Sequence, residues 1–321
     1  MGKLDKLKLT DKNNNFFTRP WWNKIVKELE KYINYNFSIK TTDNNITDPV
    51  VLGIGLFGDT VDFVDSTTVV SLSPIIIPFS GVEAFNLKSV IFSNLKSIAG
   101  SSFGNGVPGP SFYFSGITEL ETISTPKLKD VMGNVTIFGN PLLTSLDLSS
   151  IQTISGSLFI ATMPGLTDTL NLSKLLRTKT DVNITDMDGL TSIDLASLVY
   201  TPTLIIVSSA LLTSIDISSL TDIYDTLTIN NNPSLTDISI NPLGIKKKST
   251  TSLTYSFNNN ALSQTSVDNI LAAFKNLAQT ENITGKELYL DGGTSSSPTG
   301  GALNPDYVYL TVTKGWLVSI N

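Results

Sequence analysis

The stretch VTIFGNPLLTSLDLS (residues 135–149) recurs as LTINNNPSLTDISIN at residues 227–241, and three further copies lie between them. The units begin 23, 24, 22 and 23 residues apart, at Val135, Leu158, Val182, Leu204 and Leu227. Eight positions after each start stands a leucine: Leu143, Leu166, Leu190, Leu212 and Leu235. A fixed period of this length is typical of a solenoid, whose long regular face usually serves for binding.

Each unit alternates apolar and polar residues twice, as in Leu227-Thr-Ile229 and Ile215-Asp-Ile217, which is the period of a half-buried strand. A unit of about 23 residues is too short for a strand plus a full helix. We therefore expect a mainly β fold, a right-handed parallel β-solenoid with strands about 4.8 Å apart, aliphatic columns inside and polar columns outside. The consensus LTI-x-x-N-P-x-L-T-S-I-D-L-S-S-L resembles receptor L-domain and leucine-rich-repeat-like β-solenoids over roughly residues 80–262.

The same register extends toward the N-terminus. A template starting at Phe112 finds aliphatic residues in the expected positions, and an earlier unit, FNLKSVIFSNLKSI, does the same. The Gly/Ser/Pro-rich insertion from Gly100 to Pro110 separates the two and is expected to loop out. We thus predict four parts: a tail with an amphipathic helix (1–40), a β-rich segment (41–78), the solenoid (79–262) and an α/β cap (263–321).

A turn is predicted where Asn140-Pro141 and Asn232-Pro233 fall at the same position of the repeat. Asparagine tolerates left-handed backbone conformations, and proline fixes its own φ angle. We therefore expect the coil to change direction at these asparagines.

The composition limits the chemistry. The chain has no cysteine and no histidine, which excludes thiolate nucleophiles, Ser-His-Asp triads and His-ligated metals. Its net charge is −6 and it has no basic stripe, so we expect no nucleic-acid partner. A literal G-x-G-x-x-G at Gly53, Gly55 and Gly58 is followed by a β-branched stretch instead of a helix, and we expect no cofactor, no metal and no enzymatic activity.

The N-terminal residues MGKLDKLKLTDKNNNFF are polar and show no signal-peptide pattern, and no long apolar run predicts membrane insertion. Residues 19–35 predict an amphipathic helix with apolar residues on one face. Two interpretations are open. The helix covers the open end of the solenoid, or it docks the protein onto a larger assembly with Trp21 and Trp22 as anchors.

The C-terminal region predicts a small α/β cap. Val267, Ile270, Leu271, Phe274 and Leu277 form a helical stripe, followed by the strand ELYLDGG, a short helix near 304–313 and a closing strand at 316–320. The succession ALS…VDNILAAF, LYLDGG, SSSPTGG and KGWLVSIN resembles the C-terminal element behind leucine-rich or fibre-like repeats in tail and receptor-binding proteins of tailed bacteriophages, especially those of Bacteroidetes hosts.

This resemblance implies a non-enzymatic structural or receptor-binding component of a phage virion, such as a tail fibre or baseplate protein, assembled in the host cytoplasm. Its partners would be other virion proteins and a host surface glycan or protein. Analogy with phage fibres implies a homo-oligomer, trimeric in that family. Two alternatives stay open: a leucine-rich adhesin of the bacterial cell surface, and a tailspike-like glycan hydrolase.

Three sets of outward residues are candidates for ligand binding. Asp194 and Asp216 are stacked neighbours in a column with Asp147, placed to bind a cation or to form a carboxylate pair, although a solvated face explains them more simply. Thr191 and Thr213 belong to a complete threonine column, which satisfies β-propensity without any ligand. Tyr113 is expected to point outward between inward Phe112 and Phe114, in a position to stack on a sugar.

Overall fold

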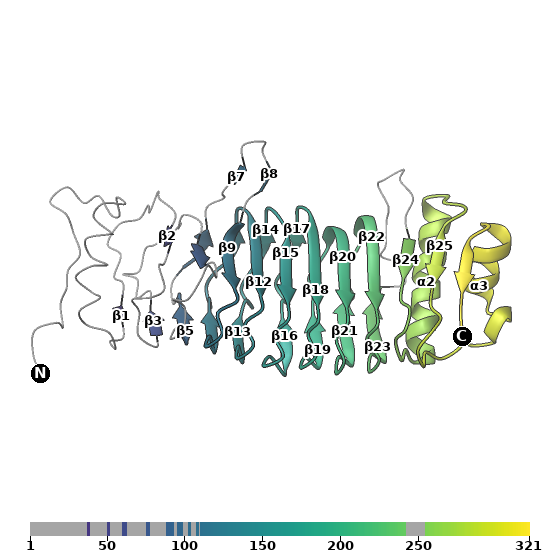
Figure 1. Cartoon of the computed structure of the whole chain (residues 1–321). Helices are drawn as coiled ribbons and strands as arrows, with labels where there is room; N and C mark the ends of the chain where they lie inside the picture. The colour runs from purple at the N-terminus through teal and green to yellow at the C-terminus, as the bar shows by residue number, and fades with distance from the viewer. Residues whose placement is uncertain are drawn as a thin grey trace, which may run out of the picture.

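The computed structural model of the chain describes residues 88–92, 95–98, 110–241 and 254–321, together with the backbone of short strands within residues 37–108. The strands stack in parallel ladders along one axis (Figure 1). The prediction of a mainly β parallel solenoid is confirmed, with about 6 rungs of ~23 residues, a rung being one turn of the coil. The predicted helix at 19–35, with Trp21 and Trp22, and the glycines at 53, 55 and 58 lie outside the described residues.

The first side of the solenoid is its longest ladder. It contains, in spatial order, β2 (Val50–Val51), β4 (Ile75–Ile77), β9 (Pro110–Ser115), β12 (Asn134–Phe138), β15 (Leu158–Ala161), β18 (Asp181–Thr185), β20 (Tyr200–Val207), β22 (Asp222–Asn230), β24 (Thr254–Ser256), β25 (Glu287–Tyr289) and β26 (Leu317–Ser319). The five unit starts pair directly, from Val135 through Leu158, Val182 and Leu204 to Leu227. The sequence period is therefore the physical register of the ladder.

The second side consists of two sheets at one position of the repeat (Figure 1). These are β1 (Phe37–Ser38), β3 (Thr60–Asp62), β5 (Ser89–Ile91), β10 (Thr122–Ser124) and β13 (Ser145–Asp147), then β16 (Thr169–Asn171), β19 (Ser192–Asp194), β21 (Ser214–Ile217) and β23 (Asp237–Ile240). The ladder is interrupted between β13 and β16, where the unit that starts at Leu158 carries one extra residue before Leu170.

The third side contains short strands: β6 (Ser97–Ile98), β11 (Asp130–Val131), β14 (Thr153–Ile154), β17 (Arg177–Thr178) and the first residues of β20 and β22. In the described strands the inward residues are mostly aliphatic and fill the space that the three sides enclose, and β17 places Thr178 there instead. Leu143, Leu190, Leu212 and Leu235 are fully buried there, as the leucine column predicts. Burial of each such side chain contributes about 1.5–3 kcal/mol.

The turn between the first and second sides is where the predicted bend lies, but asparagine has a different role in it. The left-handed residues are the preceding ones, Gly139 (φ 65°) and Asn231 (φ 58°). Asn140 and Asn232 are fully buried instead. The Oδ1 of Asn140 accepts from the backbone N–H of Ile117 (2.9 Å), and that of Asn232 from Ser209 (3.0 Å). The coil turns at these two asparagines, as predicted, and each asparagine supplies the acceptor that a buried N–H of the preceding rung needs.

The insertion predicted between 100 and 110 leaves the stack. Its strands β7 (Ser102–Phe103) and β8 (Val107–Pro108) pair antiparallel with each other and project from the solenoid (Figure 1). The parallel ladder resumes in register on either side, since Ile75 pairs with Phe112. The insertion therefore adds a hairpin without disturbing the coil.

The C-terminal cap continues the first side. Tyr255 pairs with Leu288, and Leu288 pairs with Val318, so β25 and β26 extend the ladder past residue 262. Beside them lie α2 (Gln264–Thr280), the 3₁₀ turn η3 (Gly301–Leu303), the short helix α3 (Pro305–Val308) and the π-helical turn η4 (Tyr309–Thr313). The predicted stripe from Val267 to Leu277 is the buried face of α2, whose N-cap is Ser263. A helix thus replaces the other strands of the rung.

Aromatic rings join the last rung to the cap. Tyr255 lies 4.3 Å from Phe274 of α2 and 6.0 Å from Trp316 between ring centroids, nearly parallel to the latter. The Tyr255 hydroxyl is buried without a hydrogen-bond partner, and burial raises the pKa of this phenol. The junction is stabilised by apolar and ring contacts, with one polar group left unsatisfied.

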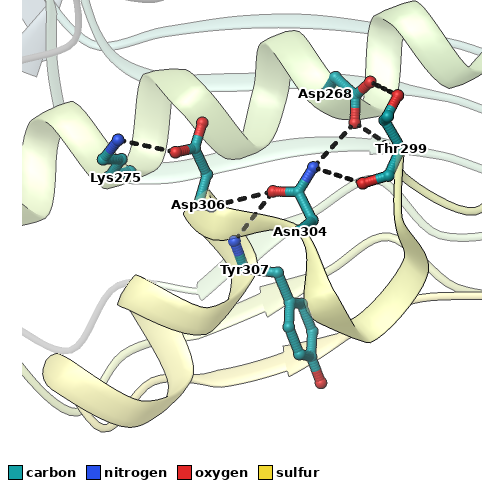
Figure 2. A network of polar contacts seen from close by, with 6 residues as sticks. All are labelled: Asp268, Lys275, Thr299, Asn304, Asp306 and Tyr307. Atoms are coloured by element: carbon teal, nitrogen blue, oxygen red, sulfur yellow. Dashed lines mark hydrogen bonds and ion pairs between the residues drawn. The ribbon is translucent and has the colours of Figure 1, made fainter.

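A polar network fixes α2 to the final loop (Figure 2). Asp268 accepts from the backbone N–H of Thr299 (2.9 Å) and from Nδ2 of Asn304 (3.2 Å). Asn304 in turn caps α3 by accepting from the N–H of Asp306 (2.9 Å), and Asp306 forms an ion pair with Lys275 of α2 (2.7 Å). Every member of this network has a structural partner, so the network accounts for cap geometry.

Candidate ligand-binding face

The outward positions of the first side, from β9 to β22, form what we call the aromatic face. One column runs through Tyr113, Thr136, Phe159, Asn183 and Ile205 in direct register. A second column, two residues further along each strand, contains Phe138 between Ser115 and Ala161. Successive side chains of a strand point to opposite sides of the sheet, so the buried partners of these residues fill the core.

Three aromatic rings meet on this face. Phe138 lies 6.1 Å from Tyr113 and 5.9 Å from Phe159 between ring centroids, edge to face in both cases. All three are half-buried. Ser115 and Ala161, the direct neighbours of Phe138, are small, which leaves room for the diagonal contacts between rings. The rings therefore support one another while part of each stays accessible to solvent.

The aromatic face is almost without charge. Among the described residues of its strands the charged side chains are Asp181, whose carboxylate accepts a hydrogen bond from Ser157, and Asp225, which is exposed at the edge of the face in β22. The other outward strand positions are hydroxyl, amide, aliphatic or aromatic: Tyr113, Ser115, Asn134, Thr136, Phe138, Phe159, Ala161, Asn183, Thr185, Thr203, Ile205, Val207, Thr226, Thr228 and Asn230. Such a surface favours a ligand without net charge.

Asn183 carries a polar atom that the fold does not use. Its Oδ1 is covered and has no hydrogen-bond partner, while Phe159 and Ile205 are its register neighbours on the adjacent strands. Most buried side-chain acceptors in proteins are satisfied. An unused acceptor next to an aromatic ring distinguishes this column from the rest of the surface.

The predicted aspartate column has a structural role. Asp194 and Asp216 are register neighbours on the second side, as expected. Each carboxylate accepts from a backbone N–H two residues later, Asp194 from Ala196 (3.0 Å) and Asp216 from Ser218 (2.9 Å). Asn171 does the same with Ser173 (3.1 Å). These are Asx turns that end the second-side strands, which explains the column without a ligand.

The predicted threonine column is also engaged with the backbone. The hydroxyl of Thr213 donates to the carbonyl oxygen of Thr191 on the preceding rung (2.9 Å), and that of Thr236 to the carbonyl of Thr213 (3.4 Å). Thr191 and Thr213 are exposed. They lie on the second side, away from Tyr113 on the first, so the structure does not bring the predicted site residues together.

Sequence reasoning found Tyr113 but missed the other two rings. Tyr113 is half-buried and points outward, while Phe112 and Phe114 are fully buried, as predicted. Phe138 stands three positions after the unit start Val135, and Phe159 one position after Leu158. The first residue of each unit points inward, so residues at odd offsets from it point outward. The repeat alone therefore predicts that both rings lie on the surface.

Within the described part of the chain, no group of three or more acidic residues is placed to hold a metal ion. No helix in that part is long and apolar enough to cross a membrane. A scan against protein-family models gave no match, and a search of curated proteins gave none either. The solenoid fold thus rests on the structure, and the resemblance to phage proteins rests on the residues quoted for it.

Proposed function

We propose that the protein is a non-enzymatic binding protein whose aromatic face takes a neutral glycan, and that it serves in host attachment as a surface component of a tailed-phage virion. The observation that carries the binding part is the row of Tyr113, Phe138 and Phe159 on a face whose described strand residues include two charged side chains, Asp181 and, at its edge, Asp225.

The chemistry of this face matches that of a sugar. The apolar C–H groups of a pyranose ring pack on the electron-rich face of an aromatic ring. Its hydroxyls need neutral donors and acceptors beside that ring, and the half-buried hydroxyls of Thr136 and Thr185 supply them. A few polar groups among apolar ones are the usual lining of a site that orients an uncharged ligand.

Binding is favoured over hydrolysis by the state of the carboxylates. A hydrolase of the tailspike kind needs two carboxyl groups on either side of a glycosidic bond. The stacked pair Asp194 and Asp216 already accepts backbone hydrogen bonds and lies on another side of the rung from the rings. The second side therefore supports a scaffold role.

The virion location rests on the resemblance of the C-terminal 60 or so residues to phage tail and receptor-binding proteins. Mass spectrometry of purified particles from a lysate that carries the gene tests it. We expect peptides of this chain in the particles. Their absence from particles, with the protein found on the bacterial surface, would replace the virion by the adhesin alternative.

The glycan part is tested on an array of neutral and acidic glycans probed with the labelled full-length protein. We expect binding to neutral glycans, unchanged by salt because no charge pairs are involved. Phe159→Ala should abolish the signal, while Thr167→Ala, an exposed second-side change, should leave it intact. Binding confined to acidic glycans, or equal binding by both variants, would contradict the assignment of this face.

A further inference from the structure

The three sides of the solenoid differ sharply in charge. Among the described residues of the second side and the turn before it, there are eight acids, in the stretches 117–125, 140–148, 163–172, 187–195, 209–217 and 232–240, and one base, Lys88, which pairs with Glu121 (3.5 Å). Glu121, Asp168 and Asp237 are exposed members of this set. From residue 117 onward, one lateral surface of the rod is therefore acidic.

The third side has the opposite charge along its first rungs. Lys96, Lys129, Lys174, Arg177 and Lys179 are exposed there, and Lys127 joins them. Among the described third-side residues from Lys96 to Lys179 there is one acid, Asp130. It accepts a hydrogen bond from the Thr153 hydroxyl (2.5 Å). The expectation that the chain has no basic stripe was wrong, because these bases come from separate units and gather on one side only in the folded coil.

Both charged surfaces also carry exposed apolar side chains. On the third side Met132 is 59% exposed, and Leu176 and Val199, neighbours on adjacent rungs, are 43% and 40% exposed. Leu142 and Leu211, in the turns that lead into the second side, are 47% and 57% exposed. Exposed apolar residues surrounded by charged ones are typical of a protein interface, which has an apolar centre and a polar rim.

We propose that the acidic second side of one copy binds the basic third side of another, so that the protein associates laterally with itself. Both surfaces repeat at the same rung spacing, because both are built on the same solenoid, and charges on one can therefore match charges on the other over several rungs. Such a contact is heterologous, since it joins two different patches. It leaves the aromatic face of every copy uncovered, which would present the glycan site multivalently.

The proposal is tested by sedimentation velocity of the full chain at two ionic strengths. We expect association at about 0.01 M salt, where the Debye length is about 30 Å, and monomers at about 1 M, where it is about 3 Å. The triple change Lys129→Glu, Lys174→Glu and Arg177→Glu should abolish association. So should the four changes Glu119→Lys, Glu121→Lys, Asp168→Lys and Asp188→Lys, which leave four acids on the second side against four new lysines and Lys88. Glu281→Lys, on the cap, is the matched control and should associate like the wild type.

Mixing the two charge-reversed proteins gives the decisive result. Each variant alone lacks one of the two complementary surfaces and stays monomeric. The mixture contains the intact acidic side of one variant and the intact basic side of the other, and it should associate again. A wild type that is monomeric at both salt concentrations overturns the proposal. Association that survives both sets of changes also overturns it, because some other surface would then be responsible. Neither outcome bears on glycan binding, which the array measures separately.

Discussion

The aromatic face and the second side are built by the same alternation of inward and outward residues, yet their outward side chains are used differently. On the second side Asp216 holds a turn and Thr213 bonds the preceding rung. On the aromatic face Phe138 and Phe159 contact each other, and Asn183 leaves an acceptor unused. A regular outward column therefore indicates a ligand site only where its polar groups are not already hydrogen-bonded within the fold.

The largest expected effect is on binding. Phe138 is the central ring, in contact with both of the others. Phe138→Ala removes a stacking surface and two ring contacts, and we expect neutral-glycan affinity to fall by about 2 kcal/mol, roughly thirtyfold. Titration calorimetry with a glycan selected on the array measures this. Phe138→Tyr keeps the ring and should bind within a few-fold of the wild type.

The next effect is on stability and comes from the second side. Asp194→Ala removes the acceptor for the Ala196 N–H, and we expect the free energy of unfolding to fall by about 1 kcal/mol with glycan affinity unchanged. Asp194→Asn is the control, since Asn171 makes the same bond at the equivalent position. Chemical denaturation compares the two variants. A loss of stability as large in Asp194→Asn as in Asp194→Ala would exclude the Asx turn as the cause.

A smaller effect is expected in the threonine column. Thr213→Val keeps the β-branched shape and removes only the hydroxyl that donates to the Thr191 carbonyl. We expect a loss of about 0.5 kcal/mol in the free energy of unfolding, because the bond is exposed to solvent. If Thr213→Val instead weakened glycan binding at constant stability, the second side would have to be counted as part of the site.

The smallest effect is expected at Tyr255, where removal of a polar group should not lower stability. The Tyr255 hydroxyl is buried and unpartnered, so Tyr255→Phe removes a polar group that gains nothing from the fold. We expect the thermal unfolding midpoint to stay the same or to rise. A clear decrease would mean that the hydroxyl has a partner in solution, such as a bound water molecule.

The sequence period was sufficient to predict the ladder, because alternation and spacing place Val135, Leu158 and Val182 in one column whatever their neighbours are. The same alternation places Phe138 and Phe159 outward, at odd offsets from Val135 and Leu158. It could not show that the N–H of Ile117 lies within reach of Asn140, or that of Ser218 within reach of Asp216, because those bonds depend on the path of the turns.

The charge of each side was equally out of reach of the period alone. Lys129 and Glu121 are eight residues apart and belong to the same unit, but a corner of the coil places them on different sides. Where the corners fall is decided by the residues that bend, such as Gly139, together with the buried acceptors beside them. The segregation becomes visible only once the three ladders are assigned.

Glycan affinity and unfolding free energy, measured together for Phe159→Ala and Asp216→Ala, test whether the aromatic face binds the glycan and the second side stabilises the fold. We predict that Phe159→Ala loses glycan binding, and that its loss of stability is about 1 kcal/mol, from the contact with Phe138. Asp216→Ala should keep wild-type affinity and lose about 1 kcal/mol of stability. Full affinity in Phe159→Ala, or lost affinity in a stable Asp216→Ala, would contradict the account.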